Sequence, residues 1–456
     1  MSASLLPPYL LEAVAAHGSA RAAACARRTL RQDMHLRTAR AGGEAPAPRE
    51  LRASPGRPSR TIFDAGGTEQ LPGERIRDEG EAAVGDPATD EAYDGLGLTW
   101  QLFSEAYGRD SLDDRGMPLL GTVHFGTDYA NAFWDGRQMV FGDGDGELFN
   151  RFTASLDVIG HELTHGVVEF TAGLRYADQS GALNESIADV FGSLVKQRAL
   201  GQTAEQADWL IGAELFTDRV RGEALRSMAA PGTAYDDPVL GKDPQPAHMD
   251  DFVVTQEDSG GVHINSGIPN RAFHLAATAL GGRAWERAGA IWYAALTGDG
   301  IAANCDFPAF AALTLAAAER RGAEEAEAVR SAWAGVGVEA GSPASGPADS
   351  AGVSAPPASA PPADDDTPVQ LGRSGGFAGL SRTREFRVGE LPREDASAWK
   401  RLLAESLPSE WREDPPQQPD RYVYRVACTE AELDVRLPEA RLPDWVRELF
   451  RRTLER

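Results

Sequence analysis

The chain has 456 residues, of which 42% are hydrophobic and 25% are charged, and its formal net charge is −24. Because this length exceeds one typical hydrophobic core, about two to four domains are expected. No apolar run approaches the roughly 18–20 residues that a bilayer-spanning helix needs. The acidic balance argues against nucleic acid or an anionic membrane as a partner. The three cysteines, Cys25, Cys305 and Cys428, are widely scattered, which predicts no disulfide framework.

Charge is distributed unevenly along the chain. Residues 1–60 contain ten arginines and four acidic residues, a net charge of +6, so the remainder carries −30. The apolar piece LLPPYLLEAVAA contains Glu12 and precedes the basic residues, the wrong order for a secretory signal, and Pro7–Pro8 interrupts a transit-peptide pattern. The remaining interpretation is a cationic segment that docks on the acidic body. Without a secretory signal, we expect either a cytoplasmic protein or one exported by a non-classical route.

The pattern of apolar residues divides the rest of the chain into segments. A stretch rich in Pro, Gly and Arg over residues 39–60 predicts an exposed linker. From Thr61 to about Asn150, short alternating runs with Gly and Asp between them predict strands and tight turns. Beyond Thr153 the period becomes helical, and helices are expected around 153–171, 181–200, 262–282 and 308–336.

The last quarter of the chain has two parts. Residues 341–368 are rich in Pro, Ala, Ser and Gly and cannot bury a core, which predicts a disordered tether. Residues 369–456 have a globular composition again, with strand-like runs REFRV and RYVYRVA and helix-like runs DASAWKRLLAESL and LPDWVRELFRRTLE. A small α+β domain is expected there.

The run DVIGHELTHGVVEF (157–170) places two imidazoles and a carboxylate within an apolar helical pattern. Residues four apart on a helix face the same way, so His161 and His165 present two ring nitrogens to one point. Glu162 lies at the edge of that face, within reach of a water held there. This H-E-x-x-H arrangement suits zinc, although two helical histidines four apart also occur as plain core or surface residues.

The next helical segment, GALNESIADVFG (181–192), offers two acidic residues four apart. Glu185 would complete a set of metal ligands, and Asp189 would accept a hydrogen bond from a ligand imidazole and fix its tautomer. Their neighbours on the segment are apolar, so two carboxylates there would be costly without a cation. Together the two segments predict a hydrolytic zinc site with one open coordination position.

Several motifs in order resemble the thermolysin family of zinc metallopeptidases: HELTH, GALNESIAD, GGVHINSGIPNRAF (260–273), NAFW (131–134) and LRSM (225–228). The resemblance extends from about Thr61 to about Gly337. It implies an α+β fold of two lobes with the zinc helix between them. The β-rich lobe with the zinc helices would span 61–205, and the helical lobe would span 206–340.

The same resemblance implies a role for each matching residue. His161, His165 and Glu185 would bind one zinc ion, and Glu162 would be the general base that takes a proton from water. The developing oxyanion would be stabilised by His263 and Tyr176, with Asp258 orienting His263. Asp258 is open to a second interpretation, because it precedes Gly260–Gly261 and also fits a simple turn.

Further matching residues would hold the substrate. Asn131 and the Ala132 backbone would keep a peptide extended along the cleft, and Arg226 would bind a substrate carbonyl, unless it is only a surface charge. The pocket for the residue just after the cut bond would be lined by Phe149, Phe152, Val158, Ile211 and Leu225. This lining favours a large apolar side chain at that position.

The sequence departs from the family where calcium is commonly bound near the zinc helices. Asp157 and Asp208 remain, but Lys196, Leu210 and Ala213 stand where acidic residues are expected. Calcium requires about six to eight oxygen ligands, and a lysine ammonium would neutralise the remaining acids instead. The sequence therefore argues against calcium at this double site.

Both ends of the chain carry additional elements. PPYLL (7–11) resembles the start of the short propeptides of the protealysin-like branch, which cover the cleft until they are cleaved. RSGGFAGLSRTREF (373–386) resembles the emfourin family, small protein inhibitors of protealysin-like enzymes; an unrelated binding module is the alternative. Enzyme, propeptide and inhibitor would then share one chain. A tether of 28 residues would span roughly 25–30 Å and give an effective concentration near millimolar.

We therefore expect a zinc-dependent neutral endopeptidase that acts on proteins or peptides and is made with a propeptide and a tethered inhibitor-like tail. Two other classes are weighed against it. A catalytically silent peptide-binding protein would not need Glu162 and His263. A metallohydrolase for other substrates would not need Asn131 and Arg226.

Overall fold

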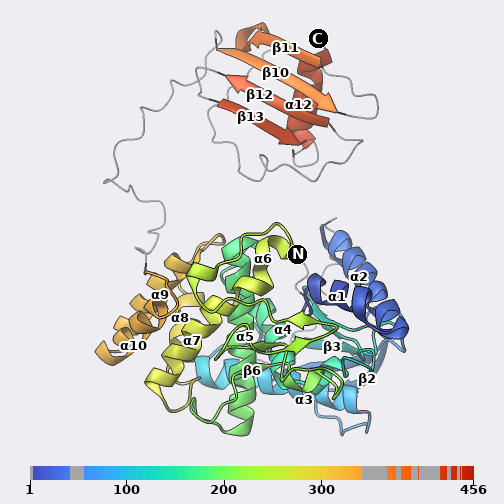
Figure 1. The fold of residues 1–456 in the computed structure, drawn as a ribbon, viewed down its shortest axis with the longest axis vertical. Helices are drawn as coiled ribbons and strands as arrows, with labels where there is room; N and C mark the ends of the chain where they lie inside the picture. Colours follow the sequence, from blue (N-terminus) through green and yellow to red (C-terminus); the bar gives the residue numbers. More distant parts are fainter. Residues whose placement is uncertain are drawn as a thin grey trace. The chain divides into compact units, whose positions relative to one another are not determined.

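The computed structural model describes residues 4–41, 56–340, 367–375, 382–391, 399, 422–428, 433–438, 442 and 444–455. Two compact units are present, residues 1–347 and residues 348–456. Figure 1 shows a mixed sheet on one side of the first unit, helices on the other, and α4 between them. The predicted α+β arrangement of a β-rich lobe and a helical lobe is confirmed.

The sheet of the first unit has five strands in the order β2-β1-β3-β5-β4. Their bounds are β1 Arg60–Asp64, β2 Glu74–Asp78, β3 Leu119–Val123, β4 Ala132–Trp134 and β5 Met139–Phe141. β1, β3 and β5 run parallel, whereas β2 and β4 are antiparallel to their neighbours. The short strand β4 is therefore an edge strand, with one side of its backbone open to another extended chain.

A helix interrupts the stretch that the sequence predicted as strands and turns. α3 spans Pro87–Gln101 and continues into a π-helical turn, Leu102–Ala106. The Asp86 side chain accepts a hydrogen bond from the Thr89 N–H at 2.8 Å, and Pro87 fits the first helical position. The prediction of strands and tight turns was wrong for this part of the segment, because Asp86 and Pro87 start a helix.

The two long helices α4 (Leu156–Glu169) and α5 (Asp178–Leu200) pack closely against each other. A Cβ on Gly192 would lie 2.4 Å from the Asp157 carbonyl oxygen, and a Cβ on Gly160 would lie 3.0 Å from the Gly192 Cα. Larger residues at either position would separate the helices. α5 ends at Gly201, which has the left-handed conformation expected of a helix C-cap.

The helical lobe contains α6 (Asp258–Asn265), α7 (Gly267–Leu280), α8 (Ala288–Leu296), α9 (Phe307–Glu319) and α10 (Ala323–Ala334). Two small antiparallel ladders precede it, β6 (Leu210–Ile211) with β7 (Arg226–Ser227) and β8 (Asp236–Asp237) with β9 (Gly241–Lys242). Short 3-10 turns lie at Phe152–Ala154, Ala213–Leu215 and Met249–Asp251. The sequence did not predict α8, since AGAIWYAAL is apolar on every side and lacks a helical period.

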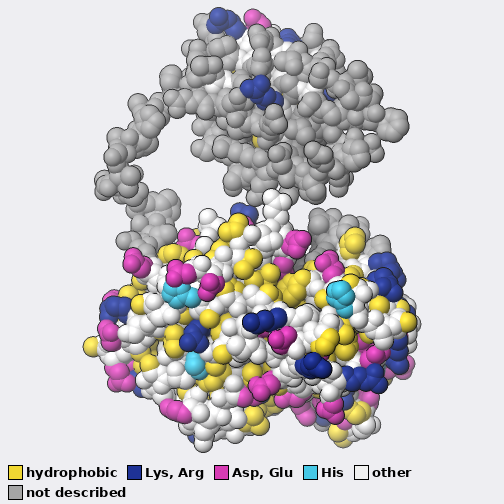
Figure 2. All heavy atoms as spheres, viewed as in Figure 1, with side chains coloured by type: hydrophobic (Ala, Val, Ile, Leu, Met, Phe, Trp, Pro, Cys, Tyr) yellow, Lys and Arg dark blue, Asp and Glu magenta, His cyan; other side chains and the backbone are white. Residues whose placement is uncertain are grey.

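The N-terminal segment forms α1 (Pro8–His17) and α2 (Ala20–Ala41) and packs on the first unit. α1 buries Leu10, Leu11 and Val14, and α2 buries Ala22, Cys25 and Ala26. Lys and Arg side chains gather over α2 (Figure 2), yet Arg21 and Arg28 both pair with Asp128 at 3.6 and 3.7 Å. The segment docks mainly through apolar side chains, where its charge had predicted an electrostatic contact.

The predicted linker at 39–60 coincides only partly with irregular structure. Residues 39–41 belong to α2, residues 42–55 lie outside the described ranges, and Arg60 begins β1. Among the described helices, none combines the length and apolar character that a bilayer-spanning segment requires.

The second unit is a four-stranded antiparallel sheet in the order β11-β10-β12-β13 with the helix α12. Its elements are β10 (Pro368–Gly375), β11 (Arg382–Arg387), β12 (Tyr422–Cys428), β13 (Leu433–Pro438) and α12 (Asp444–Glu455). Trp399 packs on Phe450 in the core and donates to Thr453 Oγ1 at 3.0 Å. A small α+β domain is confirmed, although the predicted helix over 395–407 lies outside the described residues except for Trp399.

Candidate active site

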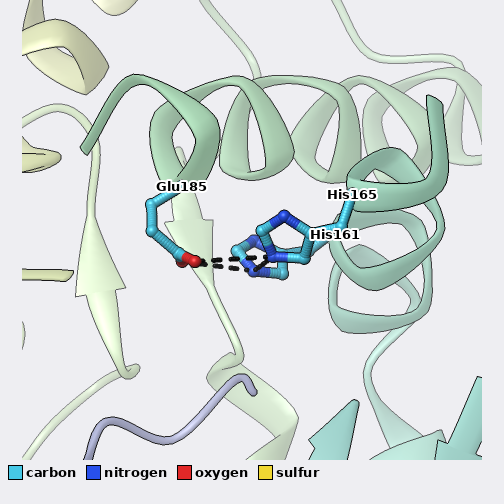
Figure 3. A group of neighbouring side chains, drawn as sticks. All are labelled: His161, His165 and Glu185. Atoms are coloured by element: carbon cyan, nitrogen blue, oxygen red, sulfur yellow. Dashed lines mark hydrogen bonds and ion pairs between the residues drawn. The ribbon is translucent and has the colours of Figure 1, made fainter. Parts of the chain in front are cut away.

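The close packing of α4 and α5 brings three side chains to one point. His161 and His165 extend from α4, Glu185 extends from α5, and all three converge (Figure 3). The Nε2 atoms of the two histidines are 3.1 Å apart, and each lies 3.5 Å from an oxygen of Glu185. All three residues are buried. The structure thus assembles the ligand set that the spacing of the two motifs predicted.

Hydrogen bonds fix how the two imidazoles are oriented. His161 Nδ1 lies 2.8 Å from Asp189 Oδ1, and His165 Nδ1 lies 2.8 Å from Asn184 Oδ1. Both partners are acceptors, so each Nδ1 carries the proton and each Nε2 presents a lone pair. Burial lowers the pKa of both histidines to about 4, so both rings are neutral near pH 7.

This arrangement fits a metal ion. Two lone pairs face each other at 3.1 Å beside a carboxylate, an arrangement that repels itself unless a cation lies between the donors. Glu185 Oε2 is buried and makes no hydrogen bond within the described part of the chain. The ligand atoms of the three residues lie within 4.8 Å of one another. Two nitrogens and one oxygen leave one position of a tetrahedral zinc site open.

Asp189 holds the ring of His161 and is itself held by other side chains. Besides His161, it binds the guanidinium of Arg226 on β7 through two hydrogen bonds of 2.8 Å, and it accepts a third from Asn270 Nδ2 at 2.8 Å. Although burial acts in the opposite direction, the Arg226 charge holds the pKa of the Asp189 carboxyl well below its usual range. Arg226 is itself buried, so it is not the surface charge considered as an alternative.

Glu162 lies on α4 between the two histidines in sequence. Its Oε2 accepts a hydrogen bond from the Trp134 backbone N–H on β4 at 3.1 Å, while its buried Oε1 has no hydrogen bond among the described residues. Burial, and next the charge of Glu185, raise its pKa well above the usual carboxyl range. A carboxylate with a raised pKa and an open oxygen is suited to accept a proton.

His263 faces the metal ligands from α6. Its Nδ1 lies 2.6 Å from Asp258 Oδ1, and its backbone N–H donates to Asp258 Oδ2 at 2.8 Å. Burial alone would lower its pKa, but Asp258 and then Glu185 raise the pKa to about 9, so the ring is charged near pH 7. Tyr176 Oη lies 3.2 Å from His263 Nε2 and donates to Glu185 Oε1.

The start of α6 has a backbone that only particular residues adopt. The four residues from Asp258 to Gly261 all have positive φ. A Cβ on Gly260 would lie 2.3 Å from the Asp178 carboxylate, so a glycine is required where this turn meets α5. The turn folds Asp258 back onto the His263 ring. Asp258 therefore lies in a turn and also holds His263, so both sequence interpretations apply.

The edge strand β4 borders the site and is already paired. The Leu5 N–H donates to the Ala132 carbonyl at 3.1 Å, and the Leu6 N–H donates to Asn131 Oδ1 at 2.9 Å. In Figure 3 the blue N-terminal segment passes beside the three ligand side chains. Asn131 Nδ2 donates to the Leu6 carbonyl at 3.3 Å and to Asp33 on α2 at 3.0 Å. The N-terminal segment thus occupies the groups expected to hold a substrate.

The five side chains predicted to line the specificity pocket are all buried, at 0–2% exposure. They come from separate elements and belong to one apolar cluster that also contains Leu5 and Leu6; they are Phe149, Phe152, Val158, Ile211 and Leu225.

The predicted calcium region contains a lysine in contact with acids. Lys196 Nζ lies 3.1 Å from Asp157 Oδ2, 2.9 Å from Asp208 Oδ2 and 3.4 Å from the Leu210 carbonyl oxygen. Burial opposes the shift, but Asp157 and then Asp208 raise the pKa of Lys196 above its ordinary value. An ammonium therefore stands among the oxygens that remain there.

Sequence reasoning missed four groups at the site. Asn184, the Trp134 N–H and Asn270 lie within motifs that were quoted for other residues, so only their individual contacts were missed. Asp33 is different, because no motif surrounds it. It lies on α2, accepts a hydrogen bond from Tyr129 Oη at 2.5 Å and from Asn131, and no sequence signal marks it.

The site combines a buried His–His–Glu set, a neighbouring carboxylate, a charged histidine and an edge strand that pairs with an extended segment. These features define a metal-dependent hydrolase that takes extended chains. Comparison with known protein families gives the more specific assignment: the chain belongs to the thermolysin metallopeptidase family. The catalytic domain of that family matches residues 56–169, and its alpha-helical domain matches residues 172–338. Residues 371–454 match the emfourin family. The enzyme is a zinc metallopeptidase.

Individual relatives support the assignment to this family. The "Extracellular metalloprotease" of Pectobacterium carotovorum subsp. carotovorum is 55% identical over 338 residues, which are 74% of this chain and 96% of that protein. The "Extracellular minor metalloprotease" of Serratia marcescens is 44% identical over 62% of this chain and 79% of its own length. The solved precursor of protealysin from Serratia proteamaculans is 54% identical, with a TM-score of 0.69, covering 74% of this chain and 99% of that one.

Proposed function

We propose that this enzyme is an endopeptidase that cuts extended peptides before a large apolar residue. The observation that carries the proposal is the position of the N-terminal segment. Its backbone pairs with Asn131 and Ala132, and its Ser4 carbonyl oxygen lies 3.1 Å from His263 Nε2. A peptide backbone therefore already fits between β4 and the metal ligands.

Each residue has a defined part in the proposed reaction. When bound by His161, His165 and Glu185, one zinc ion supplies a Lewis acid for the carbonyl and lowers the pKa of water. Glu162 accepts the proton from the attacking water and passes it to the departing nitrogen. His263, held charged by Asp258, and Tyr176 donate hydrogen bonds to the carbonyl oxygen as it gains negative charge.

Other residues would position the substrate. Asn131 offers an amide oxygen and an amide nitrogen to one residue of the peptide, and the Ala132 carbonyl accepts from its neighbour. Arg226 uses two N–H groups for Asp189, and a guanidinium carries five, so further donors remain for a substrate carbonyl. The apolar pocket lined by Phe149, Phe152, Val158, Ile211 and Leu225 supports the preference for a large apolar residue.

The two ends of the chain would regulate the enzyme. Residues 1–60 act as a propeptide that is removed on maturation, and residues 369–456 act as an inhibitor in cis on the tether 341–368. The catalytic part then comprises the lobes 61–205 and 206–340. The contacts of Ser4, Leu5 and Leu6 in the cleft support the first assignment, and the emfourin match supports the second.

Two further assignments are part of the proposal. Lys196 replaces calcium near the zinc helices, as its contacts with Asp157 and Asp208 suggest. The relatives named as extracellular support export of this enzyme from the cell.

The test is Glu162→Gln. Because the three ligands remain, the variant should keep one zinc ion per chain. Its turnover of a peptide substrate should fall about 100- to 10,000-fold, since the proton acceptor is lost. The zinc content of each purified protein is measured by elemental mass spectrometry. Turnover is compared with wild type after both proteins have been matured by a trace of active enzyme.

His165→Ala is the matched control, and it should lose both the metal and the activity. Wild-type turnover in the Glu162 variant would contradict the mechanism. Zinc binding without turnover in the wild type would instead favour a silent peptide-binding protein.

A further inference from the structure

The N-terminal segment lies in the cleft in one defined direction. Ser4 forms an antiparallel bridge with Phe133 of β4. Leu5 and Leu6 donate their N–H groups to the Ala132 carbonyl and to Asn131 Oδ1, and Asn131 Nδ2 returns a bond to the Leu6 carbonyl. One backbone hydrogen bond to β4 and two bonds to the Asn131 side chain fix the register of this segment against the strand, and a shift by one residue would break all three.

This register places one particular carbonyl in the reaction site. The Ser4 oxygen lies 3.1 Å from His263 Nε2, the group assigned above to the developing negative charge. Tyr176 Oη lies 3.2 Å from the same nitrogen. The peptide bond that follows this carbonyl joins Ser4 to Leu5. The Leu5 nitrogen is held by the Ala132 carbonyl at 3.1 Å, so both atoms of the bond are positioned.

The side chain after that bond also agrees with the proposed specificity. Leu5 is fully buried, and it belongs to the large apolar core of the first unit, of which the pocket residues Phe149, Val158 and Leu225 are also part. A leucine just after the bond is the large apolar residue that the pocket favours.

We propose that the precursor hydrolyses its own Ser4–Leu5 bond before the propeptide is released, an inference that rests on the proposed function. Water adds to the Ser4 carbonyl carbon and gives a proton to Glu162. The C–N bond breaks, and that proton passes to the Leu5 nitrogen. The second proton of the added water also passes to the Leu5 nitrogen. The products are a peptide ending in the Ser4 carboxylate and a chain beginning with the Leu5 ammonium, so one water is consumed and no other reactant is required.

This cut would trim the propeptide without releasing it. The contacts of Leu10, Leu11 and Val14 on α1 lie beyond the cut, as do the bonds from Asp33 to Tyr129 and Asn131. The trimmed chain therefore keeps its hold on the cleft. Trimming at Leu5 and removal of the whole segment are two separate events.

The experiment follows the N-terminus of the full-length chain. The protein is purified in chelator, Zn²⁺ is added, and samples are taken for intact mass and N-terminal sequencing. We expect a new N-terminus at Leu5 with a first-order rate that does not change with protein concentration. Glu162→Gln should keep residues 1–4. A rate that rises with concentration would mean cutting between molecules and would overturn the proposal.

Two variants of the segment make the test specific. Leu5→Pro removes the N–H that binds the Ala132 carbonyl, so the cut should be lost. Ser4→Ala keeps the backbone carbonyl and should be cut at the wild-type rate. Equal trimming of both variants would contradict the register.

A second readout needs no activity. In metal-free Glu162→Gln protein, the Leu5 and Leu6 amides should be protected from hydrogen exchange, and Leu5→Pro in the same background should remove the protection of Leu6. Unprotected amides would overturn the proposal. If residues 1–4 persist while the matured enzyme cuts an added peptide normally, only this inference fails. If the matured enzyme cuts no added peptide, the proposed function fails.

Discussion

His124 lies between two carboxylates that belong to different parts of the first unit. Its Nδ1 is 2.9 Å from both oxygens of Asp143, and its Nε2 is 3.3 Å from Asp86, the residue that caps α3. The Asp143 hydrogen bond raises the pKa of His124 to about 9, against the effect of partial burial. A histidine in the unfolded chain has a pKa of about 6.5. The stabilisation that this contact contributes is therefore complete below that pH. Its contribution is lost as the pH rises to about 9.

His124→Gln should therefore flatten the dependence of unfolding free energy on pH between about 6.5 and 9. The effect should be of the order of 1 kcal/mol, because the three side chains are partly exposed and solvent screens them. Urea denaturation of the inactive Glu162→Gln chain at several pH values measures it. His17→Gln, on the exposed end of α1, is the control. Identical pH profiles in the two variants would show that the contact contributes nothing.

Lys196 is a second residue whose charge should matter. Asp157 is fully buried and has the Lys196 ammonium 3.1 Å away. Lys196→Met leaves that carboxylate without a counter-charge, so the unfolding free energy should fall by about 3–5 kcal/mol. Thermal melting of the Glu162→Gln chain measures this, with the exposed Lys242→Met as control. Added Ca²⁺ should leave the melting temperature of the Lys196-containing chain unchanged; a clear rise would contradict the proposed replacement of calcium.

At the scale of elements, the sequence predicted long periodic helices and missed short ones. α4 and α5 were expected from their apolar period, whereas α8 has no polar face and α3 was hidden by Gly and Asp residues. The zinc ligands could be predicted because their spacing is local to two helices. The position of Ser4 against His263 could not, because it depends on contacts between residues far apart in the chain.

The linker between α2 and β1 should be the site of maturation. α2 ends at Ala41 and β1 begins at Arg60, and a cut between them frees α1 and α2 from the catalytic part. We expect the mature N-terminus between about Arg40 and Thr61, and no such cut in Glu162→Gln if the enzyme processes itself. N-terminal sequencing decides. A fully active enzyme that retains α1 and α2 would refute the propeptide assignment.

At the scale of the whole molecule, the second unit should restrain the first. At an effective concentration near millimolar, a tail of micromolar affinity would occupy the cleft most of the time. Deleting residues 345–456 should therefore raise the activity of the matured enzyme on a small peptide, measured as initial rate. Adding the tail back as a separate chain should lower it again.

Phe377→Ala, at a position outside the described residues, should weaken that inhibition if this side chain enters the apolar pocket. Unchanged activity after truncation, together with no binding of the separate tail, would mean that the tail serves another partner. If the tail still inhibits after Phe377→Ala, the restraint holds but residues other than Phe377 make the inhibitory contact.

β4 is only three residues long, Ala132–Trp134, and it lies at the edge of its sheet. So short an edge is a poor template for joining two folded proteins into a continuous sheet. β4 can pair with one extended segment, and that segment must first have lost its hydrogen bonds to the rest of its own protein. Native proteins meet that condition at loose loops and frayed ends, and damaged or unfolded proteins meet it along their whole length. The released enzyme would therefore select substrates first by whether a segment is locally unfolded, and only then by the side chains next to the bond that is cut.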